Sequence, residues 1–373
     1  MAAPRSSSVQ EKRNSIDDNI EVARTLPTEY YREESHFQAA RDLIFKRSWQ
    51  FIGDSDRVKI PGQASPVSLL DGFISEPLLL TRDSSDQVHC LSNVCTHRGT
   101  ILVEGECHAQ QLRCRYHGRR FSLDGKFLST PGFEQAKDFP SADDNLSAVP
   151  FQSWDKLLFA GIEPAMPFEE FIGDMRARLA WLPLSEFRFS PENSRDYIVH
   201  ANWALYCDNY LEGFHIPYVH PELAQMLDVK NYYSEIYKYS NLQLGYASSP
   251  DDVFPLPETS PDFGKPIAAY YYWLFPNLMF NFYPWGLSIN VVLPLAVNRT
   301  KVSFLTYIYD QERFDRGANT ALDRVEREDE SVVEQVQKGV RSHFYTRGRY
   351  SPQWEKGVHH FHSLLLKFLN GEN

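Results

Sequence analysis

The sequence predicts an α+β protein with two folded parts: a small all-β domain, then a larger domain of helices packed on a curved antiparallel sheet. Two observations support this. Short apolar runs broken by turn residues fill residues 58–148, which is typical of a small β domain. Beyond residue 150, strand-like runs rich in aromatic residues alternate with helical segments. With 373 residues, the chain is long enough for two or three domains with substantial cores.

We divide the chain into three segments. Residues 1–45 form a polar arm followed by a helix, because apolar residues recur at helical intervals from Tyr30 onward. Residues 46–150 form the β domain, in which "LDGK" at 123–126 resembles a hairpin turn. Residues 151–373 form the second domain.

In the second domain, the stretch from Asp196 to His220 begins as a strand and becomes helical near Asn202. Three runs then read as antiparallel strands: "AAYYYWLFPNLMFNFYP", "GLSINVVLPLAV" and "TKVSFLTYIYD". A long polar helix follows, and then a shorter one, "VHHFHSLLLKFLNG". The histidines of that last helix alternate with apolar residues, so we expect a packed helix there and no metal site.

Composition excludes several classes of function. The formal charge of −11 argues against nucleic acid as the main partner. No run approaches the roughly 18 apolar residues of a membrane span, and the N-terminus lacks the apolar core of a secretory signal. Five cysteines do not pair evenly, and four of them crowd between residues 90 and 114. This distribution favours metal binding over disulfides and predicts a reducing, cytoplasmic setting.

Two mixed cysteine–histidine pairs lie in "NVCTHRGTILVEGECHAQQLRCRYHGRRF", residues 93–121. They are Cys95 with His97, and Cys114 with His117. A Cys2His2 zinc site usually groups its cysteines and histidines separately. A mixed pair on each of two loops suits a Rieske [2Fe–2S] centre, in which two cysteines hold one iron and two histidines hold the other.

This segment resembles the C-x-H-x16-C-x2-H motif of the ring-hydroxylating-type Rieske oxygenases. Arg98, Gly99, Tyr116, Gly118 and Gly125 also match the residues that flank the motif. The resemblance implies a [2Fe–2S] cluster bound in the β domain. It also implies a catalytic domain of the helix-grip (START-like) type, which would hold a mononuclear non-haem iron.

One residue departs from the family pattern. The family commonly has Trp after "YHG", and this chain has Arg119. We expect Arg113, Arg115, Arg119 and Arg120 to form a basic collar at the exposed tip of the domain. Such a collar would attract an acidic electron donor or a neighbouring subunit; the alternative is a solvated basic surface without a partner.

A non-haem Fe(II) oxygenase needs two histidines and one carboxylate on one face. His215 and His220 in "DNYLEGFHIPYVHPE" supply the histidines, provided that Pro217 breaks the helix between them. The stretch resembles the family motif N-x-x-E/D-x-x-H-x4-H, with Asn209 and Glu212 at its first two positions.

The carboxylate must come from a distant segment. The helix "VEREDESVVEQVQKG" offers Glu326, Glu328, Asp329 and Glu330 as candidates. The family pattern places a Gln eight residues after the ligand Asp, which Asp329 and Gln337 match. The resemblance therefore implies Asp329 as the third ligand, and Glu328 and Glu330 remain alternatives.

By the same resemblance, Glu212 links His215 to a cluster histidine of a neighbouring subunit. A carboxylate can accept an N–H from each imidazole and so connect the two centres. This arrangement implies a ring of subunits, most simply a homotrimer. Asp208 is the alternative bridge, and Asn209 is expected to orient oxygen or a histidine.

Two further stretches, "LFPNLMFNFYPWGLSINVVLPL" and "GRYSPQWEKGVHHFHSLL", resemble the choline, glycine betaine and carnitine branch of the family. This implies hydroxylation of a C–H bond of a quaternary ammonium compound, with oxidation or N-dealkylation as the outcome. The alternative is an aromatic ring-hydroxylating or O-demethylating oxygenase. Ring faces bind trimethylammonium groups well, and we name Tyr206, Trp273, Phe282 and Trp285 as candidate substrate contacts, although such residues often belong to the core.

The chain has no dinucleotide-binding fingerprint after a strand. We therefore expect the electrons to come from NAD(P)H through a separate flavin or iron–sulfur reductase. The expected cofactors of this chain are the cluster and the mononuclear iron, and O2 is the co-substrate.

Overall fold

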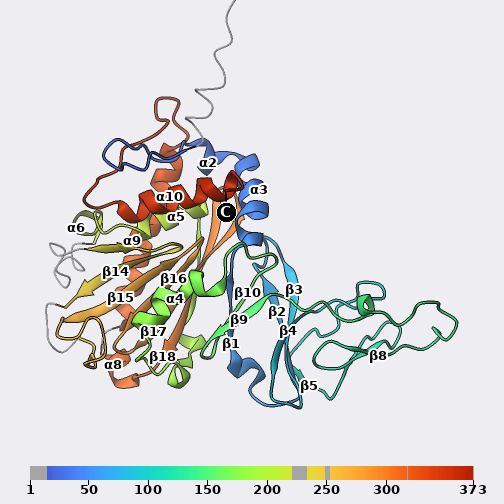
Figure 1. Cartoon of the computed structure of the whole chain (residues 1–373). Helices are drawn as coiled ribbons and strands as arrows, with labels where there is room; N and C mark the ends of the chain where they lie inside the picture. Colours follow the sequence, from blue (N-terminus) through green and yellow to red (C-terminus); the bar gives the residue numbers. More distant parts are fainter. Residues whose placement is uncertain (1–14, 221–232, 248–252, 317, 373) are drawn as a thin grey trace, which may run out of the picture. The chain divides into compact units, whose positions relative to one another are not determined.

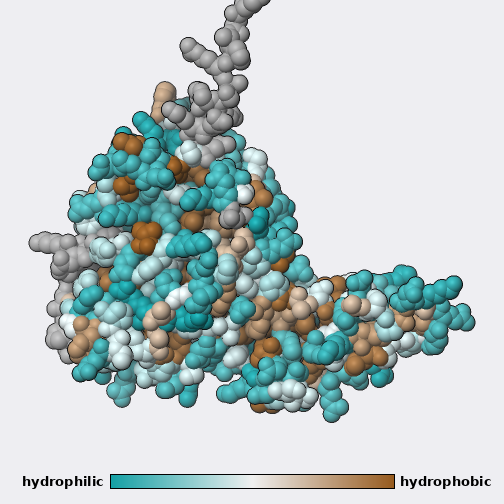
Figure 2. Space-filling view, viewed as in Figure 1, coloured by the Kyte–Doolittle hydropathy of each residue, from teal (hydrophilic) through white to brown (hydrophobic). Residues whose placement is uncertain are grey.

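The computed structural model describes residues 15–220, 233–247, 253–316 and 318–372. They fall into two compact units. Lys46–Pro164 form the first unit, and the described residues up to Phe45 join those from Ala165 onward in the second. The α+β class predicted from the sequence is confirmed. Figure 2 shows a surface that is mostly hydrophilic on the face in view, with hydrophobic residues in small groups.

The first unit consists of short antiparallel strands in three sheets, ordered β4-β3-β2-β5, β6-β7-β8 and β1-β10-β9. The strands are β1 (Gln50–Asp54), β2 (Gln63–Leu69), β3 (Glu76–Arg82), β4 (Val88–Ser92), β5 (Cys107–His108), β6 (Leu112–Arg113), β7 (Arg120–Phe121), β8 (Phe127–Ser129), β9 (Phe151–Trp154) and β10 (Leu157–Ala160). Turns of 3-10 helix lie at Phe45–Arg47, Ser55–Val58 and Ala142–Asp144. One buried cluster, which includes Leu79, Leu91 and Phe121, packs directly against Cys95 and Cys114.

The boundary of this unit differs from the predicted one. We placed the division at residue 150, but β9 and β10 pair with each other and β10 pairs with β1. Because β1 lies near the start of the unit, this pairing draws the chain up to Pro164 into the same compact body.

The second unit is built on one antiparallel sheet in the order β11-β18-β17-β16-β15-β14-β13, with β12 also paired to β18. The strands are β11 (Arg188–Phe189), β12 (Arg195–Val199), β13 (Ser234–Ile236), β14 (Ser240–Tyr246), β15 (Ile267–Leu274), β16 (Leu278–Tyr283), β17 (Gly286–Ala296) and β18 (Arg299–Ile308). The helices are α2 (Glu29–Arg32), α3 (Glu34–Leu43), α4 (Phe168–Arg178), α5 (Trp203–Tyr210), α6 (Ile216–Val219), α8 (Gln311–Asp315), α9 (Ala318–Gly339) and α10 (Lys356–Leu369), with 3-10 turns at Leu184–Glu186 and Pro191–Asn193. No helix in the described part of the chain is long and apolar enough to cross a membrane.

Two local expectations can be compared with these elements. The change from strand to helix near Asn202 is present, because the Asn202 side chain accepts the Ala204 N–H and caps α5. The run 268–284 was read as one strand, which is wrong. It forms two paired strands, β15 and β16, joined by a turn that contains Pro276.

The two faces of the sheet differ in polarity. Residues alternate between faces along a strand, and cross-strand partners share a face. One face carries Tyr271, Asn281 and Ser288, which lie opposite one another in successive strands. Helix α5 covers this face, since the Tyr210 hydroxyl donates to Asn281 Oδ1 at 2.6 Å. The other face is apolar, with buried residues such as Phe280. Helices α5, α9 and α10 pack together above the polar face (Figure 1).

Candidate metal centres

The two cysteine–histidine segments of the first unit form loops with the same backbone geometry. In each loop the cysteine N–H donates at 2.8 Å to the carbonyl oxygen five residues later. The glycine four residues after the cysteine donates back to the cysteine carbonyl at 3.0 Å. These glycines, Gly99 and Gly118, have φ of +71° and +74°, a conformation that favours glycine. The shared spacing Cys-x3-Gly therefore folds both loops alike and directs both cysteines inward.

The two cysteine side chains are buried and lie close to each other, as a shared metal cluster requires. Cys95 and Cys114 are both buried, and their side chains interact with each other. Burial raises the pKa of the Cys95 thiol. Burial also acts to raise the pKa of Cys114, but the backbone N–H groups of Tyr116 and His117 point at its sulfur and bring that pKa below its usual value. N–H donors of this kind stabilise a bound thiolate.

The two histidines complete the donor set. The rings of His97 and His117 lie 4.7 Å apart, centroid to centroid, with an interplanar angle of 63°. The Nδ1 atom of His97 is buried and has no hydrogen-bond partner among the described residues. A buried nitrogen with a free lone pair beside two thiols fits metal ligation. Two sulfurs and two imidazoles, one of each per loop, match the donors of a Rieske cluster.

Arg119 does not belong to a basic collar. Its side chain is 2% exposed, and its guanidinium contacts Asp144 Oδ1 at 3.2 Å and Thr96 Oγ1 at 2.9 Å. Arg113, Arg115 and Arg120 are exposed, as expected. The expectation was wrong for Arg119 because the loop that follows β8 folds over it.

The second donor set lies in the second unit. The structure brings His215, His220 and Asp329 together, with one possible ligand atom from each within 4.8 Å of the others. His215 precedes α6 and His220 follows it, with Pro217 at the start of this four-residue helix. Asp329 comes from α9. The expected break at Pro217 was wrong, because Pro217 stands in the first turn of α6, where proline is tolerated, and the helix is continuous between the histidines. The two histidines face one carboxylate because they flank this short helix, and His220 leaves it with φ −119° and ψ 68°.

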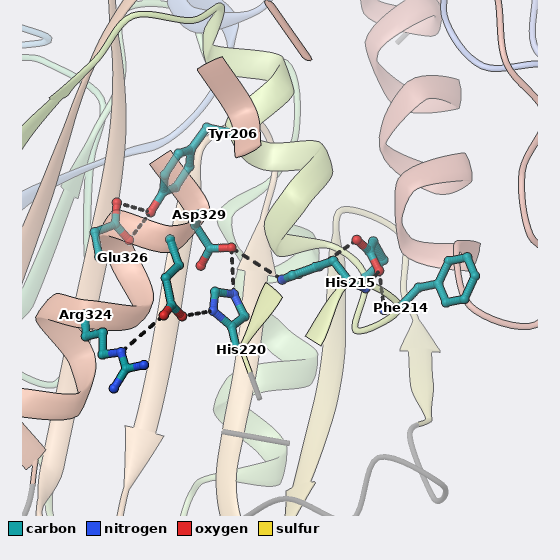
Figure 3. A network of polar contacts seen from close by, with 9 residues as sticks. Tyr206, Phe214, His215, His220, Arg324, Glu326 and Asp329 are labelled. Atoms are coloured by element: carbon teal, nitrogen blue, oxygen red, sulfur yellow. Dashed lines mark hydrogen bonds and ion pairs between the residues drawn. The ribbon is translucent and has the colours of Figure 1, made fainter. Parts of the chain in front are cut away.

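Figure 3 shows both rings directed at the same carboxylate oxygen. Asp329 Oδ1 lies 2.9 Å from His220 Nε2 and 3.4 Å from His215 Nε2. On the far side of each ring, Nδ1 bonds to another carboxylate. Glu212 Oε1 lies 2.6 Å from His215 Nδ1, and Glu328 Oε2 lies 2.7 Å from His220 Nδ1. Such carboxylate partners fix the tautomer of a metal-binding histidine and leave Nε2 free for the metal.

The electrostatics also suit a cation. Burial lowers the pKa of His215, but the carboxylates of Asp329 and Glu212 outweigh burial and raise that pKa to about 9. The His220 pKa is raised in the same way: burial opposes the change, and Asp329 and Glu328 prevail. Burial acts to raise the pKa of Asp329, and the two histidines lower it. The site therefore stabilises positive charge between these three side chains, which is the field that Fe²⁺ requires.

The alternative carboxylates occupy other positions. Glu328 bonds to His220 from behind, and it also accepts from Arg324. One carboxylate oxygen of Glu330 is buried without a hydrogen-bond partner among the described residues. Glu326 is buried and accepts from the Tyr206 hydroxyl, with Tyr206 Oη 2.7 Å from Glu326 Oε2. Neither Glu328 nor Glu330 belongs to the group of three.

The other motif residues have separate partners. Asp208 does not approach His215; its carboxylate lies 2.8 Å from His362 Nε2 and 2.9 Å from the Tyr31 hydroxyl. Asn209 is half-buried on α5. Gln337 is buried and accepts from the Asn202 N–H at 2.7 Å, so it ties α9 to the start of α5.

Of the four aromatic candidates, Tyr206 and Trp273 are buried among helices α5, α9 and α10. The Tyr206 hydroxyl bonds to Glu326, and the Trp273 ring packs on Phe361 at 5.2 Å. Phe282 lies on the apolar face of the sheet, away from α5, because it alternates with Asn281 along β16. This placement argues against Phe282 as a substrate contact.

Trp285 is buried at the end of the β16–β17 hairpin and stacks on Tyr283 at 5.1 Å. Tyr271 and Tyr283, which belong to the same aromatic runs of the sequence, are half-buried. They lie on the polar face with ring centroids 5.8 Å apart. Alternation along the strand could have separated Tyr283 from Phe282, had the inward face been known.

Comparison with known proteins gives consistent results. A model of the "Ring hydroxylating alpha subunit (catalytic domain)" matches residues 186–371, and a model of the "Rieske [2Fe-2S] domain" matches residues 48–140. Choline monooxygenase from Arabidopsis thaliana is 29% identical over 93% of this chain and 83% of its own length. The carnitine monooxygenase oxygenase subunit of Escherichia coli K12 is 27% identical over 94% of this chain and 95% of its own.

Among solved structures, a quaternary ammonium Rieske monooxygenase, described with carnitine oxidation and inter-subunit electron transfer, superposes with a TM-score of 0.77. It is 23% identical, and the match covers 94% of this chain and 96% of that one. At this identity the likeness establishes the fold.

Proposed function

This chain belongs to the ring-hydroxylating alpha-subunit family and is a Rieske non-haem iron monooxygenase; on this premise we propose that it hydroxylates a C–H bond of a quaternary ammonium compound. The observation that carries the proposal is the presence of both donor sets in one chain whose relatives act on choline and carnitine. Hydroxylation at a carbon attached to nitrogen gives a carbinolamine, which collapses to an aldehyde and a shortened amine.

We assign the cluster to Cys95, His97, Cys114 and His117, and the mononuclear iron to His215, His220 and Asp329. When bound, the cluster supplies single electrons and the iron activates dioxygen. The protein's part is to hold the donors. Glu212 and Glu328 keep a proton on Nδ1 of their histidines, so that both Nε2 lone pairs point toward Asp329.

We further propose that Glu212 connects the two kinds of centre between subunits of a homotrimer. Its Oε2 accepts the backbone N–H groups of Phe214 and His215, and its Oε1 accepts from His215 Nδ1. Two backbone donors hold the carboxylate in place, and Glu212 is the acidic residue in contact with His215 that the family motif predicts. A structural relative is described with inter-subunit electron transfer, which supports this proposal.

For the substrate we propose contacts on the polar face of the sheet. Tyr271 and Tyr283 present half-buried rings beside Asn281, and Trp285 extends this aromatic surface through its stack on Tyr283. Ring faces attract a desolvated trimethylammonium group, and the amide of Asn281 suits the polar end of the molecule. We retain Tyr206 and Trp273 as weaker candidates.

Electrons enter, in this proposal, from NAD(P)H through a separate flavin or iron–sulfur reductase. The carnitine relative is itself described as an oxygenase subunit, which supports a divided system. All five cysteines are free, which supports the cytoplasmic setting expected from the sequence.

The test is a substrate panel. Purified protein with a reductase and NADH is incubated with choline, glycine betaine, carnitine and several aromatic acids, and aldehyde release and O2 uptake are measured. We expect aldehyde from at least one amine and none from the aromatic acids. Turnover of an aromatic acid, with no aldehyde from any amine, would instead establish the alternative of an aromatic-ring or O-demethylating oxygenase.

A matched pair of variants tests the substrate surface. Tyr271→Leu is expected to raise KM for the amine about 5- to 30-fold, since a cation–π contact is worth roughly 1–2 kcal/mol. Phe280→Leu removes a ring from the neighbouring strand on the opposite face and is expected to leave KM unchanged.

A further inference from the structure

The buried guanidinium of Arg119 is the most unusual charge in the first unit. It is 2% exposed, and its Cζ lies 5.2 to 5.3 Å from the ring centroids of Phe127, Phe133 and Phe139. A buried arginine is costly unless it is paired and hydrogen-bonded. Its contacts with Thr96 and Asp144 meet part of this requirement, while its Nε has no partner among the described residues.

The Arg119 side chain lies next to both cluster loops. The Arg119 carbonyl accepts the Cys114 N–H at 2.8 Å, and Thr96, which Arg119 contacts, stands between Cys95 and His97. The Phe133 ring contacts both Arg119 and His97. The guanidinium of Arg119 lies over the ring at 5.3 Å, and the His97 ring packs edge-on against it at 5.2 Å. One aromatic ring therefore separates the guanidinium from a candidate iron ligand.

The carboxylate of Asp144 neutralises the positive charge of Arg119 only in part. Asp144 is more exposed than Arg119, at 19% against 2%, and its other oxygen accepts from the Ser141 N–H. Solvent and the Ser141 amide thus stabilise the negative end of the pair, while the positive end is enclosed in protein. A charge in such surroundings acts more strongly on its neighbours than a solvated one.

We propose that Arg119 raises the reduction potential of the [2Fe–2S] cluster and so makes this oxygenase easier to reduce. Reduction adds one electron to the cluster, and a fixed cation in a low-dielectric position stabilises the reduced state more than the oxidised state. The Trp common at this position in the family carries no charge. The inference depends on the cluster ligands proposed above and is independent of the substrate.

The test is a redox titration of the purified, cluster-loaded protein at constant pH, followed by visible circular dichroism and by the rhombic EPR signal. Arg119→Gln and Arg119→Trp are expected to shift the reduction equilibrium toward the oxidised form by about tenfold or more, where tenfold corresponds to 59 mV for one electron. Arg119→Lys, which keeps the charge, is expected to stay within about threefold of the unmodified protein.

Arg115→Gln is the matched control. Arg115 also neighbours a ligand cysteine, but it is 81% exposed, at 3.7 Å from Glu104, so its charge is screened. We expect its removal to change the reduction equilibrium less than threefold. An equal shift in the Arg115 and Arg119 variants would mean that net charge acts, and would overturn a specific role for Arg119.

Asp144→Asn keeps the hydrogen-bonding shape, removes the counter-charge, and is expected to shift the equilibrium in the opposite direction. This variant decides the question if the uncharged Arg119 variants do not fold. A cluster with an intact EPR signal whose potential is unchanged by both Arg119→Gln and Asp144→Asn would refute the proposal. Failure of the unmodified protein to show any rhombic signal would refute the proposed cluster itself.

Discussion

Nδ1 of His220 lies 2.7 Å from Oε2 of Glu328, a residue we had considered only as an alternative metal ligand. The contact leaves His220 Nε2 facing Asp329 at 2.9 Å. Removing the acceptor lets the imidazole rotate or change tautomer. Loss of such outer partners commonly weakens metal binding 10- to 100-fold. We therefore expect Glu328→Ala to bind iron more weakly by a factor of this order, as measured by competition with a chelator. An unchanged affinity would show that packing alone orients His220.

Asp329→Ala is expected to abolish iron binding at the catalytic site and leave the cluster intact. Asp329 Oδ1 lies within 3.4 Å of both histidines, and without it the three-residue site loses its negatively charged ligand and keeps only two neutral imidazoles. Iron analysis should show loss of the mononuclear iron alone, with the visible spectrum of the cluster unchanged. Asp323→Asn is the control, because Asp323 lies on the same helix and bonds to Tyr197 and Arg327. Full iron content in Asp329→Ala would contradict the assignment.

Glu212→Gln tests electron transfer separately from metal binding. The amide oxygen can still accept the backbone N–H groups, so both metals should be retained, but the link between the imidazoles is weakened. In a single turnover with substrate and O2, we expect the rate of reoxidation of the pre-reduced cluster to fall by about tenfold or more. Stopped-flow absorbance measures this rate. Normal reoxidation in a fully loaded variant would remove Glu212 from the path.

The motifs made these centres predictable because local spacing determines local geometry. The Cys-x3-Gly spacing fixes both cluster loops. The family motif located His215 and His220, although the helix between them is unbroken and Pro217 stands at its start. Among the strands of the large sheet, the apolar runs predicted β12, β17 and β18, whereas β11, β13 and β14 were not predicted. In the run that we read as one strand, Pro276 was an available signal for the turn between β15 and β16, since a central strand rarely contains proline.

The features that the sequence could not predict depend on contacts between residues that are far apart in the chain. The burial of Arg119 depends on Asp144 and on rings supplied up to Phe139, which nothing near "YHGRR" announces. Alternation showed that Phe282 and Tyr283 lie on opposite faces, but only the position of α5 shows which face is inward. Asp208 was the alternative to Glu212 as the bridge, but its carboxylate bonds to His362 from α10.

Stability should depend on pH through Glu326. Burial, with the nearby charges of Asp329 and Glu330, raises the pKa of Glu326 well above its usual value, although the Tyr206 hydroxyl opposes the change. The folded state therefore holds a proton that the unfolded state loses above about pH 4.3. The contribution to stability is complete below that pH, and it declines as pH rises toward the raised pKa, by at most about 1.4 kcal/mol per pH unit.

Glu326→Gln removes this proton uptake and keeps an acceptor for Tyr206. In metal-free protein, urea unfolding at pH 5 and pH 8 should show the variant gaining stability over the unmodified chain as pH rises. Glu334→Gln on the same helix is the control; Glu334 accepts the exposed His200 N–H. Equal pH dependence in Glu326→Gln and the unmodified chain would show that Glu326 ionises normally in the folded state.

Close contact between α10 and the end of α5 predicts that a larger residue in place of Gly357 destabilises the fold. A Cβ at this position would lie 2.5 Å from the carbonyl oxygen of Leu211, the residue that precedes Glu212. Because that atom belongs to the backbone, relief requires α10 or the segment leading to His215 to move. We expect Gly357→Ala to lower the free energy of unfolding by about 1–3 kcal/mol. Gly339→Ala, at the end of α9, meets no atom within 4 Å and should be neutral or stabilising, since alanine favours a helix by roughly 0.5–1 kcal/mol. Chemical denaturation of both variants measures the difference, and equal stabilities would show that α10 shifts at no cost.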